Sequence, residues 1–147
     1  MENEPAEEKL ILVVDDDVSI LRLVRETLTA FFFCVVDTTP SPEYAFELAL
    51  KKSYDLFLFD FQMPMVDGAL LYNLVGKVYA VVEPPLFLPP LILMSGHGEQ
   101  ARARSLLTEP GVRGLLPKPF TLDRLAARVE AAISANPPSG RILRRPE

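Results

Sequence analysis

One stretch of the sequence indicates the fold class most clearly: residues 56–68, Leu-Phe-Leu-Phe-Asp-Phe-Gln-Met-Pro-Met-Val-Asp-Gly. Its first four residues are apolar without alternation, which is typical of a strand buried on both faces of a parallel sheet. An acid, Asp60, follows at once, and apolar residues then recur at helical spacing between Leu70 and Val82. The stretch therefore predicts a strand–loop–helix unit with a carboxylate at the end of its strand.

Four further apolar runs stand at fairly even spacing, and each is followed by a segment with helical periodicity. These runs are Leu10–Val14, Phe33–Val36, Leu91–Met94 and Val112–Leu116. The last is interrupted by Arg113 and Gly114, so we expect a weaker strand at an edge. The helix expected over Glu99–Glu109 is mostly polar, so we expect it to be loosely held. Five strand–helix units predict an α/β fold: a five-stranded parallel sheet with right-handed crossovers and helices on both faces.

Composition excludes several classes of protein. The 147 residues suit one domain, and a net charge of −5 without a long basic block argues against nucleic acid as the main partner. The single cysteine, Cys34, excludes an intrachain disulfide and fits a reducing compartment. Residues 79–94 contain Glu83 and four prolines and are too short for a membrane span, and the glutamate-rich start is unlike a signal peptide. We therefore expect a cytoplasmic protein.

Polar side chains stand where the predicted strands end. The residues are Asp15, Asp16 and Asp17 after the first run, Asp60 after the third, Ser95 after the fourth and Lys118 two residues after the fifth. Ligands of open parallel sheets bind outside the carboxyl ends of the strands. The sequence therefore predicts that these side chains meet in one site.

Carboxylates gathered in this way need a partner. Two of them about 4 Å apart repel by about 4 kcal/mol at an effective dielectric near 20, so three repel by on the order of 12 kcal/mol. Protonation of one acid, pairing with Lys118 or binding of a hard cation would each relieve the repulsion. Oxygen-only ligands suit Mg²⁺, which keeps several waters and accepts a phosphate oxygen. The cluster thus indicates a Mg²⁺-dependent phosphoryl site.

Four motifs in combination resemble the receiver domain of bacterial response regulators, the phosphate-accepting component of two-component systems. They are Leu10–Val14 with Asp15-Asp16, Asp60-Phe61-Gln62-Met63-Pro64 with Asp67-Gly68, Met94-Ser95-Gly96, and Pro117-Lys118-Pro119-Phe120. The resemblance covers residues 9–135. It implies a flavodoxin-like (βα)5 fold with strand order 2-1-3-4-5, whose switch point carries the acidic site.

The resemblance implies how a phosphoryl group would be received. Asp60 would be the phosphoacceptor, attacking a phosphohistidine on a sensor histidine kinase or phosphotransfer protein to form an acyl phosphate. Lys118 would neutralise a phosphoryl oxygen, and Ser95 would hydrogen-bond to the new group. The Lys118–Pro119 bond matches one that is often cis in the family. Phosphoryl transfer needs positioning and charge neutralisation more than covalent help, which agrees with these roles.

The resemblance also implies a metal site and a mode of action. Asp16 would bind Mg²⁺ directly and Asp15 largely through water, with Asp60 and the backbone carbonyl of Gln62 completing the protein's ligands. The protein would then signal by conformational change to an unknown downstream protein. It would assist its own phosphorylation and dephosphorylation without being a classical enzyme.

The chain departs from the family pattern at one informative position. Receivers commonly carry Tyr or Phe three positions before the lysine, and Leu115 stands there instead. The aromatic half of the usual switch is therefore absent, and the route from phosphate to output is open. Proline-rich residues 83–90 resemble an insertion, which we expect to extend the loop before the fourth strand, on the face opposite the acidic site.

Other interpretations of the same residues are open. A degenerate receiver would bind partners without phosphorylation, as Leu115 encourages. A haloacid-dehalogenase-type phosphatase would use Asp15 as its nucleophile, but no acidic pair follows Lys118 and the Asp60 motif would be unexplained. The first acids could also simply cap a helix, although capping needs one acid and not three.

The domain boundaries follow from composition. We expect residues 1–8 to be a disordered acidic N-terminal tail, 9–135 the receiver domain, and 136–147 a C-terminal tail or linker. The sequence names neither the kinase nor the stimulus. It also leaves open whether the domain forms a homodimer through its last strand–helix face, although it predicts neither direct nucleic-acid nor membrane binding.

Overall fold

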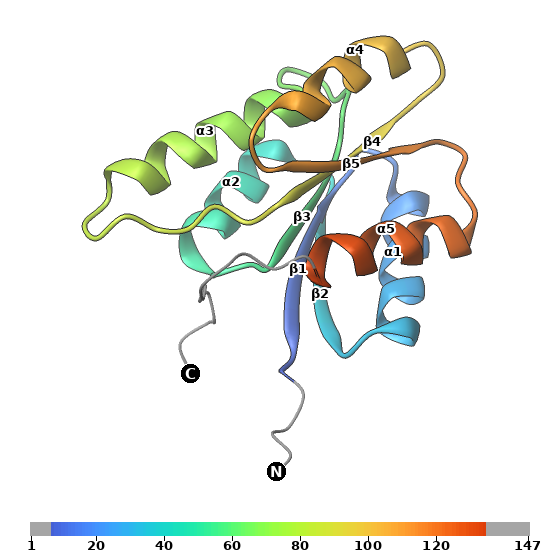
Figure 1. Ribbon diagram of the computed structural model, residues 1–147, viewed down its shortest axis with the longest axis horizontal. Coiled ribbons are helices and arrows are strands. Elements are labelled where there is room, and N and C mark those ends of the chain that lie inside the picture. Colours follow the sequence, from blue (N-terminus) through green and yellow to red (C-terminus); the bar gives the residue numbers. More distant parts are fainter. Residues whose placement is uncertain (1–6, 135–147) are drawn as a thin grey trace.

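Five parallel strands lie in the order β2-β1-β3-β4-β5 in the computed structural model, which describes residues 7–134 (Figure 1). The strands are β1 (Lys9–Val14), β2 (Cys34–Thr39), β3 (Leu56–Asp60), β4 (Leu91–Ser95) and β5 (Val112–Pro117). The predicted α/β class and the strand order that the family resemblance implied are both confirmed.

Helices cover both faces of the sheet. They are α1 (Val18–Phe31), α2 (Pro42–Lys51), α3 (Gly68–Val81), α4 (Gln100–Ser105), the short 3-10 helix η1 (Leu106–Thr108) and α5 (Leu122–Ser134). Figure 1 shows α1 and α5 on one face and α2, α3 and α4 on the other. Alternate residues of one strand serve the two faces, since Ile11 packs with the α1 and α5 side chains and Leu12 with those of α2 and α3. The central strands are therefore apolar throughout.

Side-chain caps fix where the helices begin. Asp17 accepts a hydrogen bond from the Ser19 N–H at the start of α1, and Ser41 accepts one from the Tyr44 N–H at the start of α2. Thr121 caps α5 in the same way. Each cap satisfies an N–H that the first helical turn leaves without an intrahelical partner. The loops from the strands into α1 and α5, which carry site residues, are held by such caps.

Two elements differ from the sequence predictions. β2 extends three residues past Val36, through Asp37 to Thr39, because these polar residues pair with the end of β1. The helix expected over Glu99–Glu109 is instead the six-residue α4 followed by η1, and of their residues only Ala103 is buried. Ala103 and the partly buried Leu106 provide too little apolar contact to hold a longer helix on the sheet.

The edge strand β5 is irregular, as its interrupted sequence predicts. The register with β4 shifts between the Leu91–Val112 and Ile92–Gly114 pairs, so that Arg113 has no partner in the ladder and its side chain is exposed. Residues 83–90 lead into the start of β4, at the end of the strands away from the acids (Figure 1).

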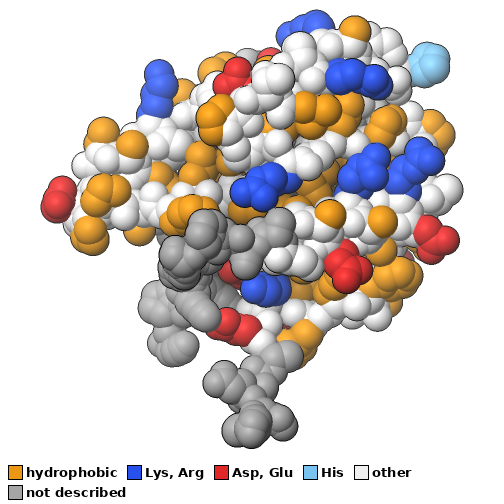
Figure 2. All heavy atoms as spheres, in the orientation of Figure 1, with side chains coloured by type: hydrophobic (Ala, Val, Ile, Leu, Met, Phe, Trp, Pro, Cys, Tyr) orange, Lys and Arg blue, Asp and Glu red, His pale blue; other side chains and the backbone are white. Residues whose placement is uncertain are grey.

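Some expectations fall outside the structure. Apart from the exposed Glu7 and Glu8, the predicted N-terminal tail and all of segment 136–147 lie outside the described residues, so the domain boundaries stay predictions. No helix within residues 7–134 combines the length and apolar character that crossing a membrane requires. On the face that Figure 2 shows, lysine and arginine side chains lie among acidic ones and do not merge into one basic stripe.

Candidate functional site

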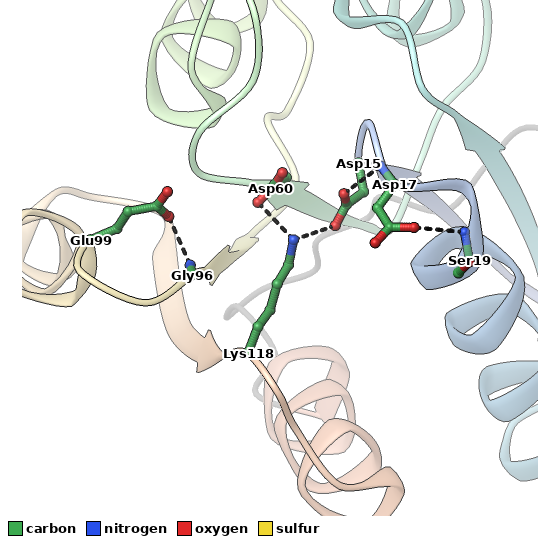
Figure 3. Close-up of polar contacts among 7 residues, drawn as sticks. All are labelled: Asp15, Asp17, Ser19, Asp60, Gly96, Glu99 and Lys118. Atoms are coloured by element: carbon green, nitrogen blue, oxygen red, sulfur yellow. Dashed lines mark hydrogen bonds and ion pairs between the residues drawn. The ribbon is translucent and has the colours of Figure 1, made fainter.

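Four strand ends bring the predicted site residues together (Figure 3). Val14 pairs with Phe59, Asp60 with Met94, and Ser95 with Pro117, so the residues that follow these strands emerge at one edge of the sheet. The Phe61 N–H continues this pairing one residue past Asp60 by donating to the Met94 carbonyl at 2.7 Å. The spatial cluster predicted from sequence is thus present.

Lys118 bridges two of the acids. Its ammonium nitrogen lies 2.9 Å from Asp15 Oδ2 and 3.2 Å from Asp60 Oδ1. Figure 3 shows the lysine side chain reaching from the loop after β5 to a point between the two carboxylates. The Lys118–Pro119 bond in that loop is cis, as the family resemblance implied. Pairing with Lys118, one of the three predicted ways to relieve the repulsion, is therefore realised.

One lysine does not offset two buried carboxylates. Burial, followed by the charge of Asp15, raises the pKa of Asp60 to about 7, against the opposing effect of Lys118. Burial also raises the pKa of Asp15, although Lys118 and the Asp17 N–H act the other way. For Lys118, burial lowers the pKa, but its bonds and charge interactions with Asp15 and Asp60 outweigh burial and raise the pKa overall. The site thus holds excess negative charge that a further cation would relieve.

The three leading acids have distinct positions. Asp15 is fully buried and its Oδ1 accepts the Asp17 N–H at 2.9 Å, whereas Asp16 is exposed. Asp17 caps α1 and is the one acid that capping explains. Helix capping therefore explains Asp17 but does not explain Asp15 or Asp16.

The donor set fits a hard cation. Asp15, Asp16 and Asp60 each place a carboxylate oxygen so that the three atoms lie within 4.8 Å of one another. Oxygen atoms from only three side chains leave coordination positions for water and a phosphate oxygen, as Mg²⁺ prefers. Gln62 lies two residues past Asp60 with its side chain exposed, and its carbonyl as a ligand stays a prediction.

Ser95 supplies an unpartnered hydroxyl. Its side chain is fully buried at the end of β4, and Oγ has no hydrogen-bond partner among the described residues. A buried hydroxyl without a partner is destabilising, so such groups in native proteins are commonly kept for a functional reason. Its place beside the acids suits a donor to an incoming anion.

Sequence reasoning missed two contacts that shape the site. Gly68 begins α3 so close to β3 that an added Cβ would collide with the Asp60 carbonyl oxygen, and its N–H donates to the Phe61 carbonyl at 2.9 Å. The Glu99 carboxylate accepts the Gly96 N–H at 2.7 Å. An acid three residues after Gly96 is the spacing of a capping box, a signal that could have identified Glu99.

Comparisons with known proteins agree with this geometry. The family model described as "Response regulator receiver domain" matches residues 11–130. A probable chemotaxis protein CheY from Rhizobium etli is 28% identical over 88% of this chain and 96% of its own length. The DNA-binding transcriptional regulator NtrC from Escherichia coli K12 is 33% identical over 85% of this chain but only 25% of its own length. A crystal structure of a response regulator receiver domain protein from Clostridium thermocellum superposes with a TM-score of 0.73 at 25% identity, covering 86% of this chain and 94% of that one.

Proposed function

This chain belongs to the response regulator receiver domain family, a signalling family of two-component systems, and from that premise we propose that Asp60 is its phosphoacceptor. The observation that carries the proposal is the position of the Asp60 carboxylate. It stands at the end of β3, 3.2 Å from the Lys118 ammonium and with oxygens of two further acids close by. A nucleophile, a charge-neutralising cation and a candidate Mg²⁺ site thus share one edge of the sheet.

The proposed reaction is a phosphoryl transfer. A carboxylate oxygen of Asp60 attacks the phosphorus of a phosphohistidine, the P–N bond breaks, and the imidazole leaves with its electron pair. The Lys118 ammonium stabilises negative charge on the phosphoryl oxygens, and the Ser95 hydroxyl donates to one of them. Mg²⁺ bound by Asp15, Asp16, Asp60 and the Gln62 carbonyl would supply further charge neutralisation. The product is an aspartyl phosphate.

Geometry supports Asp60 over Asp15 as the covalent residue. Asp15 is fully buried, its Oδ1 is hydrogen-bonded to the Asp17 N–H and its Oδ2 is ion-paired with Lys118. Asp60 is buried as well, but it contacts Lys118 through Oδ1, which leaves Oδ2 for attack. Both oxygens of Asp15 are engaged, so this arrangement disfavours the haloacid-dehalogenase interpretation. The intact acid cluster likewise favours a phosphorylated receiver over a degenerate one, although Leu115 still replaces the aromatic residue.

The remaining functional expectations belong to this proposal. A sensor histidine kinase or phosphotransfer protein is the proposed phosphodonor, and an unidentified protein the recipient of the signal. The domain would assist its own phosphorylation and hydrolysis without acting on other substrates. Because the chain spans only about a quarter of the NtrC relative, that protein's DNA binding is not transferred to it. A cytoplasmic location stays a prediction.

Intact-mass spectrometry after treatment with acetyl phosphate and Mg²⁺ tests the proposal. The wild-type chain is expected to gain one phosphoryl group, and Asp60→Asn to gain none. Asp123→Asn, which removes an exposed carboxylate from α5, serves as the matched control and should label like wild type. Labelling of Asp60→Asn at the wild-type level would overturn the proposal.

A further inference from the structure

The turn between β4 and α4 is closed by a carboxylate. The Gly96 N–H donates to Glu99 Oε1 at 2.7 Å, while the Glu99 N–H donates back to the Gly96 carbonyl at 3.2 Å (Figure 3). A hydrogen bond from a backbone amide to an ionised carboxylate is roughly twice as strong as one between neutral groups. The Gly96 N–H therefore already holds an anion, and that anion belongs to the residue that directly precedes α4.

The turn that carries this N–H directly follows the strand beside Asp60. Asp60 pairs with Met94 across neighbouring strands, so the next residues along the chain are Ser95, which ends β4, and Gly96, which follows it. An aspartyl phosphate presents three terminal oxygens, and each needs a donor or a cation. Lys118 serves one, and the donors at the end of β4 and just after it are the unpartnered Ser95 hydroxyl and the Gly96 N–H.

We propose that Glu99 is an internal competitor of the phosphoryl group, occupying the Gly96 N–H in the unphosphorylated protein and leaving it when Asp60 is phosphorylated. This inference rests on the proposed function of Asp60. Two forces act together: the phosphoryl group competes for the donor, and its negative charge repels the carboxylate. Glu99 is thus a positioning residue, because it sets the state of a donor without touching the reacting atoms.

Release of Glu99 carries the signal into α4. The Arg102 guanidinium, one turn further along, lies 5.0 Å from the centre of the Phe61 ring, the residue next to Asp60. The first turn of α4 is therefore tied to the site by two side chains of opposite charge, and α4 buries only Ala103. Since Leu115 offers no aromatic switch, these contacts form an alternative route from the phosphate to the helix.

The alternative is that Glu99 merely caps the turn. Glu99→Gln separates the two cases, because glutamine keeps an oxygen that can accept the Gly96 N–H but loses the charge. Glu99→Ala loses both the bond and the charge. Glu109→Gln is the matched control, since it also removes one negative charge but lies at the end of η1, by the opposite edge of the sheet.

The experiment is a titration of each protein with beryllofluoride and Mg²⁺, a mimic of the aspartyl phosphate, followed by fluorine NMR. Glu99→Gln is expected to bind the mimic about three- to tenfold more tightly than wild type, as loss of one nearby like charge implies. Glu109→Gln should stay within about twofold of wild type. Hydrogen exchange should show residues 99–105 losing protection in wild type on binding, and losing less in Glu99→Gln.

The outcomes separate this inference from the proposed function. Equal affinities of Glu99→Gln and Glu109→Gln would show that Glu99 only caps the turn and would overturn the inference alone. If wild type binds no beryllofluoride, or Asp60→Asn binds it equally well, the assignment of Asp60 fails first. Glu99→Gln keeps the hydrogen-bond acceptor, so the test does not depend on the folding of Glu99→Ala.

Discussion

Replacing Asp60 with asparagine is expected to stabilise the protein when Mg²⁺ is absent. Burial and the charge of Asp15 raise the pKa of Asp60 from 3.8 to about 7, so ionising this group in the folded state is unfavourable. At about 1.36 kcal/mol per pKa unit the penalty above pH 7 is at most about 4 kcal/mol. This penalty already includes the attraction of Lys118. Asparagine removes the penalty, but places an amide in a buried position built for a carboxylate, at a cost of about 1–2 kcal/mol. We expect a net gain of about 1–3 kcal/mol.

The sign of the pH dependence follows from the raised pKa. Between about pH 4 and pH 7 the folded protein binds more protons at Asp60 than the unfolded chain, so this group's contribution to stability falls as pH rises. Asp60→Asn lacks that fall, and the stability difference between variant and wild type should widen from pH 4 to pH 7 and then level off.

Urea unfolding followed by circular dichroism at several pH values, with a chelator present, measures this difference. Glu130→Gln removes an exposed charge from α5 and should change stability by less than about 0.5 kcal/mol. A wild-type protein at least as stable as Asp60→Asn at pH 8, or a difference independent of pH, would refute the reasoning that Asp60 is held as an uncompensated buried charge.

Three further predictions test other parts of the site. Lys118→Met leaves the Asp15 and Asp60 carboxylates without their cation and should lower the free energy of unfolding by about 3–5 kcal/mol at pH 8, with a smaller loss at pH 5 in urea titrations. Asp16→Asn should weaken Mg²⁺ binding at least about tenfold in calorimetry while leaving the metal-free melting temperature nearly unchanged, because Asp16 is exposed; unaltered affinity would remove it from the ligand set. Gly68→Ala should destabilise by about 1–3 kcal/mol in thermal unfolding, since its Cβ would meet the Asp60 carbonyl oxygen; wild-type stability would contradict that close approach.

Strands buried on both faces were the most predictable part of the fold. No polar residue interrupts Leu56–Phe59 or Leu91–Met94. So short a run that is apolar throughout is typical of a central strand in a parallel sheet, which is buried on both faces. The end of β2 escaped prediction because Asp37 is stabilised by tertiary contacts. Its carboxylate accepts the Tyr54 hydroxyl at 2.7 Å, and that partner is distant in sequence.

Helix α4 shows a different limit. The segment Glu99–Glu109 has a helical composition, and the sequence correctly indicated few apolar anchors. The end of the helix could not be predicted from the sequence. The chain passes from Ser105 directly into the 3-10 helix η1, and such 3-10 turns are common at helix ends in many different sequences.

The proximity of the candidate site residues was predictable, but their contacts were not. Parallel topology alone brings Asp15, Asp60, Ser95 and Lys118 to one edge, so their proximity follows once the strands are identified. That Lys118 would bridge Asp15 and Asp60 could not be derived, because the sequence does not fix where the side chains point. The Glu99–Gly96 contact had a signal in its spacing, but a capping pattern alone gave no reason to connect it with the site.

Chemical mapping of the phosphorylated residue tests the central claim most directly. Sodium borohydride reduces an aspartyl phosphate to homoserine, so protein treated with acetyl phosphate and Mg²⁺, reduced and digested can be read by tandem mass spectrometry. If Asp60 is the phosphoacceptor, homoserine is found at position 60 and at no other aspartate. Homoserine at position 15 or 16, with Asp60 intact, would contradict this assignment.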